Sequence, residues 1–178
     1  EWHGEFNSQL ESSEGLQPGL LPAFVIMLFI IVLLFNAYRP PMIIIILIPF
    51  AAIGISFGLL ITGAPFGFMA LLGAMSLAGL MIKNSIVLID EIKANLSAGQ
   101  SPYDATVGAG LSRIRPVVLG AATTILGVIP LLQDAFWVSM SMTIMAGLAF
   151  GTVITMILVP VLYAALHRIP SPQRENGG

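Results

Sequence analysis

Five long runs of apolar residues, separated by short polar stretches, dominate the chain. The runs cover residues 20–36, 42–61, 66–89, 113–133 and 136–166. Because an α-helix rises about 1.5 Å per residue, a run of about 17 or more apolar residues crosses a hydrocarbon core about 30 Å thick. The pattern therefore predicts an all-α integral membrane fold, with five transmembrane helices in one domain over residues 18–168.

The polar stretches suggest how these helices are connected. Residues 38–41, YRPP, combine an interfacial aromatic, a cation and two prolines, which predicts a tight turn at a membrane surface. Residues 62–65, TGAP, predict a second short turn. In the central loop, Ser101 suits a helix N-cap, Pro102 the first helical position and Asp104 the first turn, so we expect a short cytoplasmic surface helix there.

The two ends of the chain are polar. Residues 1–17 carry four glutamates and no lysine or arginine, unlike the basic start of a signal peptide. They hold too few apolar residues to bury a core, so we expect them to be the end of an external loop of a longer protein. Residues 169–178 contain two prolines and two glycines and are expected to form a disordered cytoplasmic tail.

Composition supports the membrane assignment and excludes other classes. The chain is 57% hydrophobic and only 9% charged, far from the average of soluble domains. A net charge of -2 with scattered basic residues argues against nucleic-acid binding. The two histidines lie in opposite flanks and there is no cysteine, so the sequence predicts no metal site and no enzyme.

The basic residues predict an orientation. With one exception, every lysine and arginine falls in the first turn, the central loop or the C-terminal tail. Five spans place these three regions on one side, which the positive-inside rule makes cytoplasmic. The N-terminal end is then external and the C-terminus internal.

The exception is Lys83, which lies about 10 Å inside the third apolar run. A lysine at this depth is costly, so we expect it to face a protein interior and to pair with a carboxylate, a carbonyl or water. An intramembrane charge indicates function, here a protonatable group. The alternative is a permanent structural pair with Asp90, seven residues further on the same helical face.

Other polar residues are candidates to assist Lys83. Asn84 points to an adjacent face and suits either a structural or a functional hydrogen bond. Arg113 shares a helical face with Gly120 and Thr124, although a lipid-facing role for Arg113 is an alternative. Thr123 and Thr124 offer hydroxyls near the level of Lys83, unless each only bonds its own preceding turn.

Four segments together resemble one transporter family. They read GLMIKNSIVLIDEI, AGQSPYDAT, RIRPVVLGAATTILGVIPL and AGLAFGTVITMILVPVLYAAL. They are similar to the C-terminal membrane half of resistance-nodulation-division (RND) efflux transporters of the hydrophobe/amphiphile type, over residues 18–166. The resemblance implies that the five spans correspond to helices eight to twelve of such a pump.

The resemblance also implies roles for the polar residues. In this family a lysine pairs with two aspartates of the other membrane half, and a basic residue and a hydroxyl on the next helix assist. Lys83 matches the lysine, Asn84 its neighbour and Arg113 the basic position. The hydroxyl position falls on Gly120, a departure from the family pattern, and Thr123 or Thr124 one turn on are the substitutes.

The implied activity is proton-driven efflux across the bacterial inner membrane, without a cofactor beyond the proton-motive force. The implied partners are an N-terminal half with its aspartate pair, two further copies in a trimer, a periplasmic adaptor, an outer-membrane channel and the lipid bilayer. Two rivals remain at this point: a protein- or lipid-export relative of the same superfamily, and a membrane scaffold that does not transport.

Overall fold

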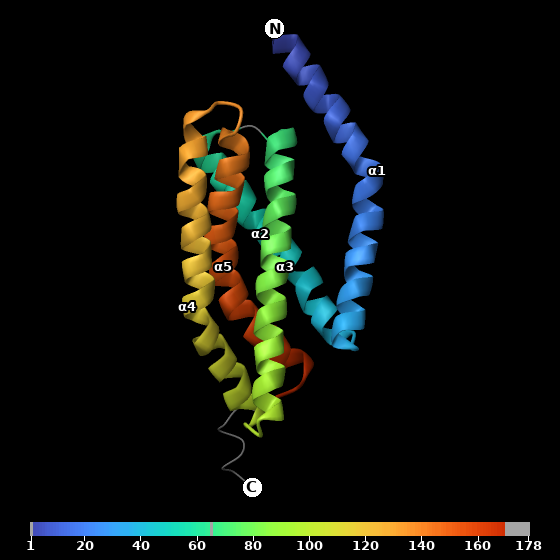
Figure 1. Ribbon diagram of the computed structural model, residues 1–178, viewed down its shortest axis with the longest axis vertical. Coiled ribbons are helices and arrows are strands. Elements are labelled where there is room, and N and C mark those ends of the chain that lie inside the picture. The colour runs from blue at the N-terminus through green and yellow to red at the C-terminus, as the bar shows by residue number, and fades with distance from the viewer. Residues whose placement is uncertain (1, 65, 170–178) are drawn as a thin grey trace.

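The computed structural model describes residues 2–64 and 66–169, and its described elements are five α-helices and one short 3₁₀ helix. The elements are α1 (Trp2–Phe35), α2 (Arg39–Thr62), α3 (Phe68–Ser97), α4 (Pro102–Val128), η1 (Ile129–Gln133) and α5 (Val138–Leu166). All five α-helices contain a stretch long and apolar enough to cross a membrane. The predicted all-α membrane fold is therefore confirmed, and Figure 1 shows the helices running up and down along one long axis.

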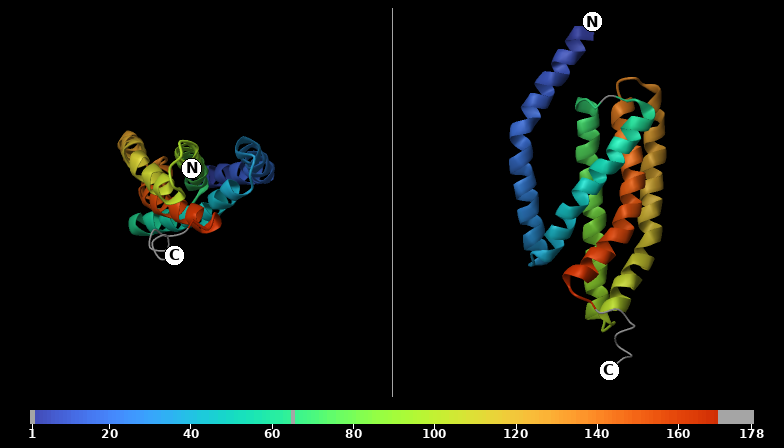
Figure 2. Two further views of the ribbon diagram at one scale, coloured as in Figure 1. Left: turned by 90° about the horizontal axis from the view of Figure 1, so that it is seen from below. Right: turned by 180° about the vertical axis from the view of Figure 1, so that it is seen from behind.

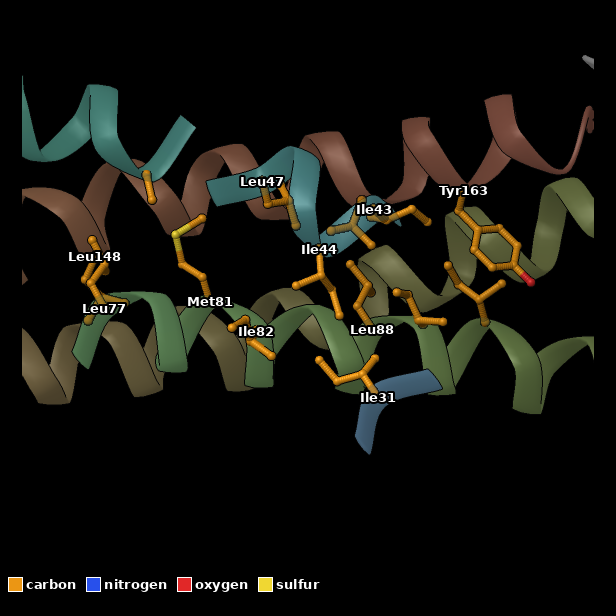
Figure 3. Packing of buried hydrophobic residues seen from close by; sticks show 14 of the residues in the cluster. Ile31, Ile43, Ile44, Leu47, Leu77, Met81, Ile82, Leu88, Leu148 and Tyr163 are labelled. Carbon is orange, nitrogen blue, oxygen red and sulfur yellow. The ribbon is translucent and has the colours of Figure 1, made fainter. Parts of the chain in front are cut away.

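The centre of the bundle is α5, which packs against α2, α3 and α4. Figure 3 shows the core between these helices, with Met81, Leu77 and Leu148 close together. Small residues allow the close approach, because a side chain at Gly58 would collide with Ala146 and one at Gly147 would collide with Leu77. The glycine pairs Gly54–Gly58 of α2 and Gly147–Gly151 of α5 are thus packing surfaces between α2, α3 and α5.

The first helix is peripheral and longer than its predicted span. It contacts α2 and α3 only lightly, and Figures 1 and 2 show it standing beside the bundle, with its N-terminal part extending past the end of the other helices. The helix runs without interruption from Trp2, so residues 2–17 continue the span as a helix. Pro18 and Pro22 lie inside α1, where each removes a helical hydrogen bond, and Figure 1 shows that this helix is bent.

The connections differ in detail from the predicted turns. Pro40 and Pro41 form the first turn of α2, where missing N–H groups cost nothing, and the preceding turn contains Asn36 at a φ of 47°. Gly63 ends α2 in the left-handed conformation, with a φ of 63°, which favours glycine. The predicted tail at 169–178 lies outside the described residues except for Ile169.

The central loop contains the predicted cap but no separate surface helix. The Ser101 Oγ accepts a hydrogen bond from the Asp104 backbone N–H at 3.2 Å, which confirms the N-cap. The helix that begins there continues through Pro116 to Val128 as a single element. Ala105 and Ala109 are fully buried, and Asn95 of α3 donates to the Ala105 carbonyl at 3.2 Å. The start of α4 therefore packs against the bundle instead of lying free on the membrane surface.

Candidate functional site: a polar groove between α3 and α4

A groove of about 320 Å³ lies between α3 and α4 and contains most of the polar residues singled out in the sequence. Its lining comprises Leu80, Lys83, Asn84, Val87, Pro116, Val117, Gly120, Ala121, Thr124 and Leu148. The lining residues of α3 recur three or four positions apart, as do those of α4, so each helix contributes one of its faces as a wall of the groove. Leu148 of α5 completes the lining.

Lys83 lies exposed in this groove and does not face the interior of the five-helix bundle. Among the described residues its side chain forms no hydrogen bond and no ion pair. The side chain of Asp90, the partner expected in a purely structural pair, also forms none. The expectation that Lys83 finds a partner is therefore not met within the described chain. An ammonium at this depth in a membrane needs such a partner from elsewhere.

Asn84 is half-buried in the same groove, and its amide has no hydrogen-bond partner among the described residues. Its two N–H donors and its carbonyl oxygen are available beside the ammonium of Lys83. The two neighbouring residues thus present donors and an acceptor to the same space.

The two threonines of α4 occupy different positions. The Thr124 side chain lines the groove, whereas Thr123 is exposed and is not part of the lining. Each hydroxyl donates to a carbonyl one turn earlier, Thr123 to Leu119 at 2.7 Å and Thr124 to Gly120 at 2.9 Å. Such a hydroxyl keeps its lone pairs as acceptors, so Thr124 is the better placed of the two to receive a proton donor in the groove.

An ion pair closes one end of the groove. The Arg113 guanidinium donates to the Glu91 carboxylate at 2.5 Å, and Glu91 follows the lining residue Val87 by one turn of α3. Arg113 precedes Val117 by one turn of α4. The Arg113 Nε is buried without a hydrogen-bond partner among the described residues. Arg113 therefore faces the groove side of α4, in line with Gly120 and Thr124.

Glu91 was not among the residues singled out in the sequence. Helical spacing could have indicated its position, because Asn84, Val87 and Glu91 are separated by three and four residues and therefore share one face of α3. Arg115, the second basic residue of the same motif, is exposed on α4. Within the described part of the chain, no group of three or more histidine, aspartate or glutamate side chains gathers as a metal site.

Small residues border the groove on its open side. An added side-chain atom at Gly79 of α3, or at Gly120 and Gly127 of α4, would meet nothing within 4 Å. Small residues on membrane helices commonly let another helix approach closely. Together with exposed Lys83, they form a face that suits packing against further protein.

Comparison with known proteins decides the family. The model of the AcrB/AcrD/AcrF family matches residues 1–167. The chain belongs to this family. It is accordingly part of an RND transporter, as the sequence motifs suggested, and the match includes the groove residues of α3 and α4.

Individual relatives agree with this assignment. The chain is 31% identical over 155 residues to the swarming motility protein SwrC of Bacillus subtilis, covering 84% of this chain and 15% of the relative. It is 30% identical over 156 residues to the multidrug resistance protein MdtC of an Enterobacter species, with the same coverages of 84% and 15%. The MdtC of Pectobacterium atrosepticum is 29% identical over 182 residues, covering 97% of this chain and 18% of the relative.

A solved structure shows the same fold. The crystal structure of a heavy metal efflux pump matches with a TM-score of 0.79 and 24% identity, covering 92% of this chain and 17% of that chain. The RND chain described here therefore spans less than a fifth of the length of these relatives.

Proposed function

We propose that this chain supplies the lysine side of an intramembrane proton relay in a proton-driven RND efflux transporter. The observation that carries the proposal is the groove in which Lys83, Asn84 and Thr124 lie together, with Lys83 exposed and unpaired among the described residues. An ammonium at mid-membrane depth is stable only beside a counter-charge. Because the described residues offer Lys83 none, we infer that the counter-charge is a carboxylate of a membrane half outside this chain.

The groove face is suited to such a partner. Gly79, Gly120 and Gly127 leave room for a helix to approach, and the carboxylates that it carries would then reach Lys83. In this arrangement the five helices take the place of helices eight to twelve. Arg113, held by Glu91, supplies a second positive charge at the end of the groove.

Proton movement then works through the charge balance. When the partner carboxylates are ionised, Lys83 is drawn to them, and when one takes up a proton, the attraction weakens and the lysine is released toward Asn84 and Thr124. Moving one proton through about 100 mV supplies about 2.3 kcal/mol, enough to shift two conformations of similar energy. The complete pump would work as a trimer at the inner membrane with a periplasmic adaptor and an outer-membrane channel, without enzymatic chemistry.

The test uses a full-length transporter that carries this segment. We expect Lys83→Ala to reduce proton-coupled export at least about tenfold while the protein remains inserted, because partner carboxylates without a counter-charge repel each other and keep their protons, and a pKa rise of one unit already corresponds to a factor of about ten. Lys83→Arg should also fail, since a bulky planar guanidinium does not replace a compact ammonium. The measurement is export beside the amount of inserted protein, with Arg115→Ala as the control that removes an exposed cation of the next helix.

A scaffold that does not transport predicts the opposite result. In a scaffold, Lys83→Ala would lower the amount of folded protein and Lys83→Arg would restore it. Export at the normal rate by Lys83→Ala would exclude the relay. The cargo, whether a drug, a metal, a lipid or a protein, is a separate question that these variants leave untouched.

A further inference from the structure

A second polar cluster lies at the end of the bundle where α1 ends and α2 begins, away from the Lys83 groove. Figures 1 and 2 show the end of α5 and the lower part of α3 close to this turn. Three cationic or titratable side chains lie near one another there, from two helices and the segment that follows α5: Arg39, Lys93 and His167.

Contacts hold two of these residues, Lys93 and His167, in place. The Lys93 ammonium lies 4.5 Å from the centre of the Phe35 ring and donates to the Phe35 carbonyl at 3.4 Å, which joins α3 to the end of α1. The His167 ring stacks on Tyr163 with 4.0 Å between ring centres. The His167 Nδ1 lies 3.0 Å from the Tyr163 carbonyl. Because a carbonyl only accepts, Nδ1 holds a proton and Nε2 remains free for another partner.

The charges around His167 are all positive. Burial lowers the pKa of His167 below its ordinary value of 6.5, the hydrogen bond to the Tyr163 carbonyl raises it, and Arg39 and Lys93 lower it further. No carboxylate contributes to this shift. Of the two carboxylates nearest in sequence to Lys93, Glu91 is paired with Arg113, and Asp90 is exposed and forms no ion pair among the described residues. The cluster thus lacks a counter-charge within the described chain.

The apolar surroundings indicate which anion fits. Exposed apolar side chains lie within two turns of the cluster on α2 and α5, and beside Phe35 at the end of α1: Leu33 and Leu34 (each 64% exposed), Met42, Ile45 and Val161. Basic pockets between membrane helices bind anionic lipid headgroups through their phosphate, and an apolar wall beside such a pocket suits acyl chains. A free phosphate ion has no acyl chain and would not contact these apolar side chains.

We propose that Arg39, Lys93 and His167 bind the phosphate of an anionic phospholipid at the junction of α1, α2, α3 and α5. The lipid would supply the counter-charge that the cluster lacks. It would also tie the otherwise loosely packed first helix to the bundle, since Lys93 already contacts the last residue of α1. The site is independent of the proposed proton relay.

The first test places the full chain in lipid nanodiscs made of phosphatidylcholine, with or without phosphatidylglycerol. Native mass spectrometry of the released protein should show one retained phosphatidylglycerol per chain. In parallel, NMR should show a higher pKa of His167 in the anionic discs, because Nε2 must be protonated to donate to phosphate. His3 is the only other histidine, and His3→Gln assigns the signals. Equal His167 pKa values in the two kinds of disc would overturn the proposal.

Variants then locate the site. Arg39→Gln and His167→Gln should each weaken phosphatidylglycerol retention about fivefold, the factor that corresponds to about 1 kcal/mol for one charge near the membrane surface. Arg115→Gln removes an equal charge from exposed α4 and should leave retention unchanged. An equal loss in Arg115→Gln would show only general attraction to an anionic surface. A His167 pKa that rises with inorganic phosphate in lipid-free detergent, but not with phosphatidylglycerol, would overturn the lipid assignment.

Discussion

The buried hydroxyls of α5 form two groups at the scale of single residues. Thr143 is fully buried and donates to the Ser139 carbonyl at 2.8 Å. Ser141, Thr152 and Thr155 are also buried, but their hydroxyls have no partner among the described residues. A buried hydroxyl without a partner costs about 1 to 3 kcal/mol, so these two groups should respond differently to loss of the oxygen.

We therefore expect Thr155→Val to stabilise the protein by about 1 kcal/mol, since valine keeps the shape and removes the unpaired group. Thr143→Val is the matched control and should give no gain, because its hydroxyl is already bonded. Thermal unfolding in detergent measures both. A lower melting temperature for Thr155→Val would mean that the hydroxyl finds a partner in the membrane, in water or in another part of the transporter.

At the scale of elements, α3 and α4 are joined by the pair of Glu91 and Arg113 at the end of the groove. Their side chains are 24% and 36% exposed, which places the pair between a surface and a buried salt bridge. Such a pair contributes modestly and is weakened by salt. Its second effect is positional, because it holds the Arg113 guanidinium on the groove side of α4.

We expect Glu91→Gln to lower the free energy of unfolding by about 1 kcal/mol, a value discounted for the partial exposure of both groups. Asp90→Asn removes the neighbouring carboxylate, which is exposed and unpaired among the described residues, and should change little. The measurement is thermal unfolding at low and high salt, combined with Arg113→Gln in a double-mutant cycle. A coupling energy of zero between positions 91 and 113 would contradict a stabilising pair.

At the scale of the whole molecule, the basic residues gather at one end. The starts of α2 and α4 and the ends of α3 and α5 lie toward the same end of the bundle in Figure 1. Arg39 begins α2, Lys93 lies in the last turns of α3 and Arg168 follows α5, whereas Arg113 and Arg115 lie near the middle of α4. The connection between η1 and α5 lies at the opposite end, with no lysine or arginine. This asymmetry predicts that the basic end is cytoplasmic.

Cysteine labelling checks the orientation, and the absence of natural cysteines makes the background simple. Single substitutions Ser12→Cys and Ala135→Cys should react with an impermeant thiol reagent in intact cells, whereas Ala98→Cys should react only after lysis. All three positions are exposed, so burial does not limit the reaction. Labelling of Ala98→Cys in intact cells would reverse the predicted topology.

The sequence by itself determined the membrane class, the five spans and the family, because long apolar runs and motifs such as the Lys83–Asn84 pair are local properties of the chain. It also located the N-cap at Ser101, where a side chain bonds to a residue three positions away. Helical periodicity correctly placed Gly120 and Thr124 on one face.

Only the tertiary structure decided which faces meet. It placed Lys83 in a groove instead of the bundle interior, paired Glu91 with Arg113, and brought Arg39, Lys93 and His167 together from helices far apart in the chain. It also joined the expected surface helix to α4, because Ala105 and Ala109 pack against the bundle. These outcomes depend on contacts between residues distant in sequence, and an apolar run that is hydrophobic on every side carries little information about which neighbour each side will contact.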